Sequence, residues 1–171
     1  MAKEYYYDTR SPSAVTEQQF FHESRAKHAD KEIGTNMPLD AAFDKDIKIS
    51  KIICILEPLL KNSTTNCDPA LFGDYLKVVT EGVIAAQVGD GMINHFPLSY
   101  CLAKSAVLGS ITGFLASGAT GAYGLISSQS VNGAYGLDVN IPVPKNATLK
   151  FYLKTKSSVT LANIRIVLEV E

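Results

Sequence analysis

Apolar and polar residues alternate most regularly in the last part of the chain, residues 137–171. From residue 149 to residue 153 every second residue is apolar, and the residues between them are a lysine and a tyrosine. The same alternation returns in residues 163–171, after Ser157-Ser158. A period of two with one polar side is typical of antiparallel strands covered on a single face. The pattern predicts a strand at residues 137–144 and, after it, a terminal β-hairpin.

Two further strand regions and one helix are predicted earlier in the chain. In residues 47–56 apolar and polar residues alternate at first, and from residue 52 on every residue is apolar. This pattern predicts a strand that runs from an exposed position into the interior, with a bulge at Ser50-Lys51. Residues 82–88 and 92–102 flank Gly89-Asp90-Gly91, so we expect a hairpin with a tight turn. Residues 70–80 carry apolar residues at helical spacing, and we expect a short connecting helix there.

The inward phase of these strands gives the expected core. Its members are apolar and recur at every second position: Ile47, Ile49, Ile53, Ile55, Leu149, Phe151, Leu153, Ile164, Ile166 and Leu168. A sheet with one apolar face needs a second layer to cover that face. The pattern therefore predicts an antiparallel β-sandwich.

Residues 1–35 have the composition of an arm that precedes a folded domain at residues 36–171. Polar and charged residues dominate, and aromatic residues occur in two clusters, Tyr5-Tyr6-Tyr7 and Phe20-Phe21. A short helix over residues 16–28 and a flexible terminus are the alternatives. Because clustered aromatic side chains are costly to leave in water, we expect the arm to become ordered on a partner. Deletion of residues 2–30 should then weaken oligomers and leave the domain's thermal transition nearly unchanged.

Charge is nearly absent from the middle of the chain. Residues 82–141 contain only Lys104, Asp90 and Asp138 as charged residues, together with ten of the 12 glycines. Since such a surface tends to associate, we expect residues 105–136 to form a packed loop or short strands at a subunit contact. A membrane span is the alternative for residues 105–128, but glycine, serine and threonine crowd that segment. The candidate contact residues are the aromatic side chains Tyr5, Tyr6, Tyr7, Phe20, Phe21, Phe114, Tyr123 and Tyr135.

Composition and motifs argue against several classes of function. The formal net charge is −1 and no basic run occurs, so we expect no nucleic-acid binding. The three histidines and three cysteines show no metal-ligand spacing, and neither a nucleophile elbow nor a phosphate-binding glycine loop occurs. We therefore expect no metal, no cofactor and no enzymatic activity. No export signal opens the sequence, which indicates synthesis in a cytoplasm, where the cysteines stay reduced.

The order of these elements resembles the single jelly-roll structural proteins of viruses, particularly small capsid or vertex proteins of bacteriophages. The resemblance spans residues 36–171 and is clearest in two segments, Ile141-Pro142-Val143-Pro144-Lys145-Asn146-Ala147-Thr148-Leu149-Lys150-Phe151 and Ile164-Arg165-Ile166-Val167-Leu168-Glu169. These segments look like the penultimate and final strands of such proteins, in which a proline-rich entry precedes an alternating strand. Six or seven strands are recognisable in the sequence, whereas a jelly roll has about eight.

The resemblance implies an all-β fold: an antiparallel β-sandwich of jelly-roll type with an N-terminal arm and one short connecting helix. It also implies a virion subunit assembled in the host cytoplasm, whose partners are copies of itself and other virion proteins. Because the arm is not basic, it should reach a neighbouring subunit and not a packaged genome. The first alternative is a carbohydrate-binding or adhesin module, with Tyr123, Tyr135 and Tyr152 as stacking residues. The second is a hydrolase with an unrecognised site.

Overall fold

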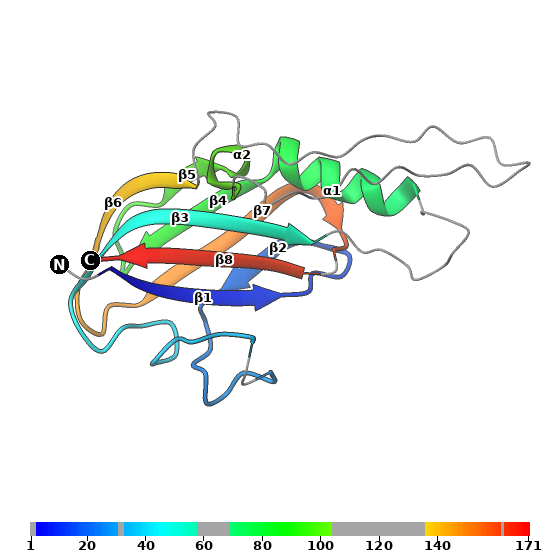
Figure 1. The fold of residues 1–171 in the computed structure, drawn as a ribbon. Coiled ribbons are helices and arrows are strands. Elements are labelled where there is room, and N and C mark those ends of the chain that lie inside the picture. Colours follow the sequence, from blue (N-terminus) through cyan, green and yellow to red (C-terminus); the bar gives the residue numbers. More distant parts are fainter. Residues whose placement is uncertain (1–2, 31–32, 58–68, 104–135, 162) are drawn as a thin grey trace, which may run out of the picture.

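The computed structural model describes residues 3–30, 33–57, 69–103, 136–161 and 163–171. They form two antiparallel sheets of four strands each (Figure 1). Sheet A has the order β1-β8-β3-β6 and sheet B the order β2-β7-β4-β5, which confirms the predicted all-β, antiparallel sandwich. The elements are β1 (Glu4–Arg10), β2 (Val15–Phe20), β3 (Ile47–Glu57), α1 (Pro69–Glu81), β4 (Val83–Val88), β5 (Asn94–Pro97), α2 (Leu98–Cys101), β6 (Leu137–Val143), β7 (Leu149–Val159) and β8 (Asn163–Val170).

Each strand of the first half of the chain pairs with a strand of the second half. β1 pairs with β8, β2 with β7, β3 with β6 and β4 with β5, all antiparallel. The pairings of β3 with β8 and of β4 with β7 join these pairs into the two sheets. Glu4 lies opposite Val170, so the two ends of the chain lie side by side at one end of sheet A (Figure 1). Strands far apart in the sequence therefore close the fold.

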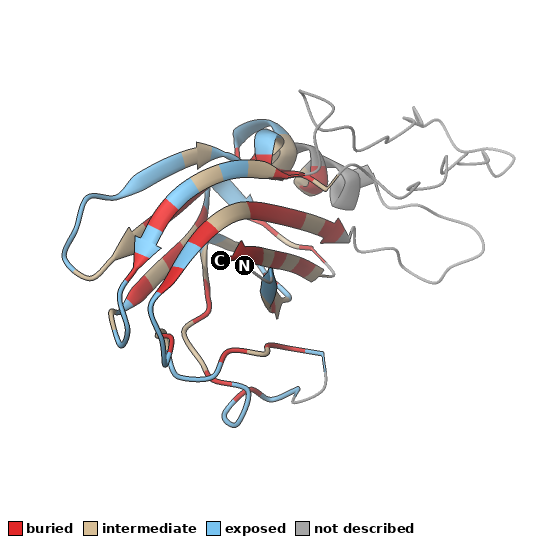
Figure 2. Ribbon diagram, turned by 60° about the vertical axis from the view of Figure 1, so that its left-hand side comes forward, coloured by how far each residue is buried: buried red, intermediate tan, exposed pale blue. Residues whose placement is uncertain are grey.

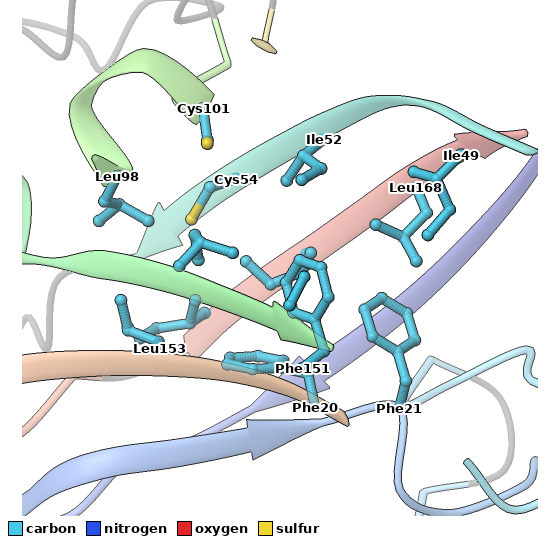
Figure 3. Close-up of a cluster of buried hydrophobic side chains, with 14 of the residues drawn as sticks. Phe20, Phe21, Ile49, Ile52, Cys54, Leu98, Cys101, Phe151, Leu153 and Leu168 are labelled. Atoms are coloured by element: carbon cyan, nitrogen blue, oxygen red, sulfur yellow. The ribbon is translucent and has the colours of Figure 1, made fainter. Parts of the chain in front are cut away.

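A single hydrophobic layer fills the space between the sheets. Buried and more exposed residues alternate along the strands that border it, as Figure 2 shows. Phe20 of β2, Phe151 of β7 and Leu168 of β8 are fully buried, and the ring of Phe21 meets that of Phe151 edge-on at 5.5 Å between centroids (Figure 3). Burying one such side chain stabilises the fold by roughly 1.5–3 kcal/mol. All the predicted core residues of β7 and β8 are buried.

A bulge in β3 changes which of its residues face the core. The register between β3 and both of its neighbours shifts between Ile49 and Lys51, which confirms the predicted bulge at Ser50-Lys51. The residues of β3 in the core are Ile47, Ile49, Ile52, Cys54 and Leu56. Ile53 is buried as predicted, at 3% exposed, but it lies outside the cluster between the sheets, and the prediction for the half-buried Ile55 is wrong. The reason is that one inserted residue moves every later side chain to the other face.

The connections between strands differ from the prediction at two places. β7 and β8 are consecutive but lie in different sheets, so the predicted terminal hairpin is wrong. An alternating sequence looks the same whether the next strand turns back beside it or crosses to the other sheet. The hairpin expected at residues 82–102 forms between β4 and β5, and Gly89 adopts the left-handed conformation (φ 55°) in its turn. Its second strand ends at Pro97, because α2 follows.

The helix α1 confirms the predicted connecting helix at residues 70–80. Tyr75 and Val78 are buried, and the Asp74 carboxylate accepts a hydrogen bond of 2.9 Å from the backbone N–H of Thr160. These contacts fix the helix beside the end of β7. Neither α1 nor α2, the two helices of the described residues, is long and apolar enough to cross a membrane. The alternative of a span at residues 105–128 concerns a segment outside the described residues.

The prediction that residues 1–35 form an arm outside the sandwich is wrong. β1 lies at the edge of sheet A and β2 at the edge of sheet B, so the segment contributes a strand to each. The helix considered at residues 16–28 is also wrong, since residues 15–20 form β2 and residues 21–28 are turns and bends. A short edge strand is held by its partner strand and few apolar contacts, so the polar sequence of β2 carries no clear alternation.

We predict that Phe20→Ala lowers the free energy of unfolding by about 3–5 kcal/mol, because it opens a cavity in the core beside Phe151. The matched control is Gln19→Ala, its neighbour on the other face of β2, for which we expect a change below about 1 kcal/mol. Urea denaturation of the three chains measures both values. Equal stability of Phe20→Ala and the unsubstituted chain would contradict the placement of β2 in the sandwich.

Candidate assembly surface

The outer face of sheet A presents two tyrosines of the predicted contact cluster Tyr5-Tyr6-Tyr7. Side chains alternate along β1, so Tyr5 and Tyr7 point outward with the register partners Glu169 and Val167 of β8. Tyr6 points the other way and meets the ring of Phe43 edge-on at 4.8 Å. Tyr5 is 51% exposed and Tyr7 is half-buried. Tyr5 and Tyr7 are therefore the members of this cluster that a partner can reach on this face.

A row of polar and charged side chains crosses this face at the level of Tyr5. Tyr5 of β1, Glu169 of β8, Lys51 of β3 and Asp138 of β6 lie side by side in the register of the sheet. Glu169 accepts hydrogen bonds from Lys3 Nζ at 2.7 Å and from the Tyr5 hydroxyl at 3.1 Å. Lys51 Nζ lies 3.2 Å from Asp138 Oδ1. Charges of both signs are thus paired across four strands.

Glu169 is only 7% exposed although it lies on the outer face. The hydrogen bond from Lys3 lowers the pKa of the Glu169 carboxyl, and the bonds from Tyr5 and Ser50 add to this, while partial burial opposes it. A carboxylate with a lowered pKa in the folded state stabilises the fold above its unfolded pKa. That stabilisation is lost as the pH falls through the folded value.

An apolar row lies next to the charged one. Tyr7, Val167 and Ile53 are register neighbours, and Ile53 is 3% exposed. The guanidinium of Arg165 stacks on the Tyr7 ring at 5.7 Å, and its Nε donates a hydrogen bond of 2.9 Å to Thr9 Oγ1. A cation held over an aromatic face is stabilising and fixes both side chains. Ile53 is covered, so the accessible apolar part of this face is the half-buried pair Tyr7 and Val167 beside the charged row.

The other predicted contact residues do not join this surface. Phe20 and Phe21 are fully buried in the core, so the prediction that they bind a partner is wrong. Their clustering reflects a strand end at which consecutive residues enter the space between the sheets. Phe114, Tyr123 and Tyr135 lie outside the described residues.

Residues 21–40 form a loop, called the edge loop below, that covers the free edge of β1. The N–H of Thr9 donates to the carbonyl of Gly34 at 2.7 Å, and the N–H of Asn36 donates to the carbonyl of Tyr7 at 3.3 Å. Thr35 lies opposite Asp8 as an isolated bridge. Because these bonds occupy the backbone of β1, this edge is protected against strand addition by another chain.

A buried charged cluster lies where the edge loop meets β1. The Asp8 carboxylate is fully buried; its Oδ2 accepts hydrogen bonds from the Phe21 N–H and, at 3.1 Å, from Arg10 Nη2. Its Oδ1 accepts no hydrogen bond from the described residues, but it forms an ion pair with Arg10 Nε at 3.1 Å and lies 3.9 Å from His28 Nε2. Burial raises the pKa of the Asp8 carboxyl, and the Phe21 N–H, Arg10 and His28 oppose this. The sequence analysis missed the cluster, whose signal is the Asp-x-Arg spacing that places both side chains on one face of a strand.

The turn between β4 and β5 exposes two adjacent apolar side chains. Met92 is 86% exposed and Ile93 is 52% exposed. Single exposed apolar residues are common on protein surfaces, whereas adjacent ones at a turn favour contact with another molecule. Their exposure was not predicted from the sequence, because both residues fall within the strand predicted at residues 92–102. In contrast, the described residues contain no group of three or more His, Cys, Asp or Glu side chains that could hold a metal ion.

We predict that Glu169→Gln destabilises the fold by about 1–2 kcal/mol at pH 7, because its charge-assisted hydrogen bonds with Lys3 are lost. The difference from the unsubstituted chain should shrink as the pH falls below the ordinary glutamate pKa of 4.5, and it should vanish below the lowered pKa of the folded carboxyl. The control is Asp138→Asn in the same row, which is 83% exposed and should change stability by less than about 0.5 kcal/mol. Denaturation at several pH values checks this; a pH-independent difference for Glu169→Gln would refute it.

Comparison with known proteins leaves the function to be argued from the chain's own geometry. No protein-family model, no curated protein and no solved structure matches it. The pairing of the strands and the surfaces described above are therefore the observations on which a function is proposed.

Proposed function

We propose that this chain is a structural subunit of a virus particle, folded as an eight-stranded jelly roll, with copies of itself and other virion proteins as partners. The observation that carries the proposal is the pairing of β1 with β8, β2 with β7, β3 with β6 and β4 with β5. In a jelly roll, the first half of the strands pairs antiparallel with the second half as one long hairpin, and this hairpin is rolled into two layers. Such a fold contains this set of strand pairs. Double-sheet jelly rolls of eight strands recur in viral capsid proteins, and also in lectin domains and cupins.

Several surface features support assembly as the task of this fold. The outer face of sheet A offers Tyr5 and the half-buried pair Tyr7 and Val167 beside paired charges. Met92 and Ile93 project from the β4–β5 turn, within a stretch of sequence that is almost uncharged. Protein contacts favour such aromatic and apolar centres, with charge kept to the rim. Tyr5 and the Met92–Ile93 turn are the contact sites that we propose.

We predict that the full chain forms closed oligomers, rings or shells at micromolar concentration. Light scattering after size exclusion measures the mass, and negative-stain electron microscopy shows the closed shape. A chain that stays monomeric at high concentration would contradict the proposal, and binding of that monomer to a glycan array would favour a carbohydrate-binding module. The position of the gene provides a separate check, since a virion subunit should lie beside packaging or portal genes.

We further predict that the double substitution Met92→Ser with Ile93→Ser weakens association by on the order of 100-fold. Burial of each apolar side chain in the contact contributes about 1.5 kcal/mol to association, and serine removes that contribution. Asn94→Ser, the exposed polar neighbour at the start of β5, is the matched control and should associate normally. Sedimentation at a series of concentrations gives both affinities. Oligomers that persist unchanged in the double variant would show that the turn is not a contact.

A further inference from the structure

Two free cysteines lie together in the core where α2 meets β3. Cys54 of β3 and Cys101 of α2 are both buried and unbridged, and both belong to the hydrophobic layer. In Figure 3 the Cys101 side chain points from α2 toward β3, whereas the Cys54 sulfur points away from Cys101 into the core. The Cys101 thiol donates a hydrogen bond of 3.7 Å to the Pro97 carbonyl. The residues that the structure describes include two cysteines, Cys54 and Cys101. The third cysteine of the chain, Cys67, lies outside the described residues.

Backbone contacts join β3 to the end of α2 next to these two residues. Leu102, the residue after Cys101, pairs with Cys54 in a parallel bridge, and the N–H of Ala103 donates to the Cys54 carbonyl at 2.9 Å. Paired residues on neighbouring strands lie about 5 Å apart, and a disulfide spans about 4.4–6.8 Å between Cα atoms. Cys101 is one residue removed from such a pair. Forming the disulfide therefore requires α2 to shift, the Cys101 thiol to leave the Pro97 carbonyl, and the Cys54 side chain to turn toward Cys101.

We propose that Cys54 and Cys101 are an oxidisable dithiol, and that a small-molecule disulfide such as oxidised glutathione converts them into a disulfide that ties α2 to β3. The Cys101 thiolate attacks one sulfur of the small disulfide, which forms a mixed disulfide and releases one thiolate. The Cys54 thiolate then attacks Cys101 Sγ and releases the second. Two protein thiols lose two electrons and two protons, and the small disulfide leaves as two thiols.

The surroundings of the two thiols determine how fast this reaction runs. Burial raises the pKa of the Cys101 thiol to about 12 and that of the Cys54 thiol well above its ordinary value, so thiolate is scarce at neutral pH. Access to Cys101 requires α2 to lift, and α2 is one turn of helix without a side-chain cap, held at its start by the bond of 2.8 Å from the Leu98 N–H to the Gly82 carbonyl. Oxidation is therefore slow in the folded chain and accelerates with rising pH.

We predict that oxidised glutathione at mildly alkaline pH lowers the mass of the full chain by about 2 Da and reduces its thiols, counted in denaturant, from three to one. Peptide mapping should join residue 54 to residue 101, and the Tm should rise by roughly 5–10 °C. Cys54→Ala and Cys101→Ala should each abolish the crosslink, whereas the control Cys67→Ala should form it as the unsubstituted chain does.

Three retained thiols, or a crosslink that includes Cys67, would overturn the proposal. If a cysteine variant fails to fold, the peptide map of the unsubstituted chain decides by itself. The mass and the peptide map measure the crosslink and the light scattering measures assembly, so this inference and the proposed function can fail independently.

Discussion

The hydrophobic layer between the two sheets is the constraint on which the rest of the structure depends. Every strand has to direct one set of alternating side chains into this layer, and the phase of each strand follows from that need. The bulge in β3 shows how strict the requirement is, because one inserted residue exchanges the roles of the two faces. The residues between the inward-facing ones form the outer surface of sheet A, which includes the row through Glu169.

Polar groups inside the fold are placed where the sheets end. Asp8 is buried on the core side of an edge strand, and Arg10 and the N–H of Phe21 supply the donors that its charge requires. Burying a charge is tolerated only where a partner and hydrogen bonds compensate for the lost water. The edge loop provides these donors and at the same time covers the backbone of β1. One segment thus satisfies a buried charge and protects a sheet edge.

Sequence reasoning found the elements whose local pattern is strong and missed those that depend on distant partners. β3, α1 and β6 to β8 could be predicted because their apolar residues recur with a clear period. β1 could not, since Tyr5-Tyr6-Tyr7 repeats one residue type that suits both faces and so hides the alternation. The crossing of the chain from sheet B to sheet A between β7 and β8 could not be predicted, because apolar and polar residues alternate with a period of two in both sheets. Of the candidate site, Tyr5 and Tyr7 were predicted from the sequence. The buried cluster at Asp8 was not, because in the sequence its residues look like ordinary surface charges.

The pairing of β1 with β8 has a consequence for the timing of folding. Glu4 and Val170 face one another, so β1 has no partner in sheet A until β8 leaves the ribosome. At a translation rate of roughly 5–20 residues per second, the time between the synthesis of β1 and that of β8 is about 8–30 s. Long-range pairing of this kind also folds slowly, because loop closure precedes the gain in contacts. A chain that has not yet reached β8 lacks the central neighbour of both β1 and β3. The outer face of sheet A therefore forms only after β8 has been synthesised, and synthesis itself withholds that surface until then.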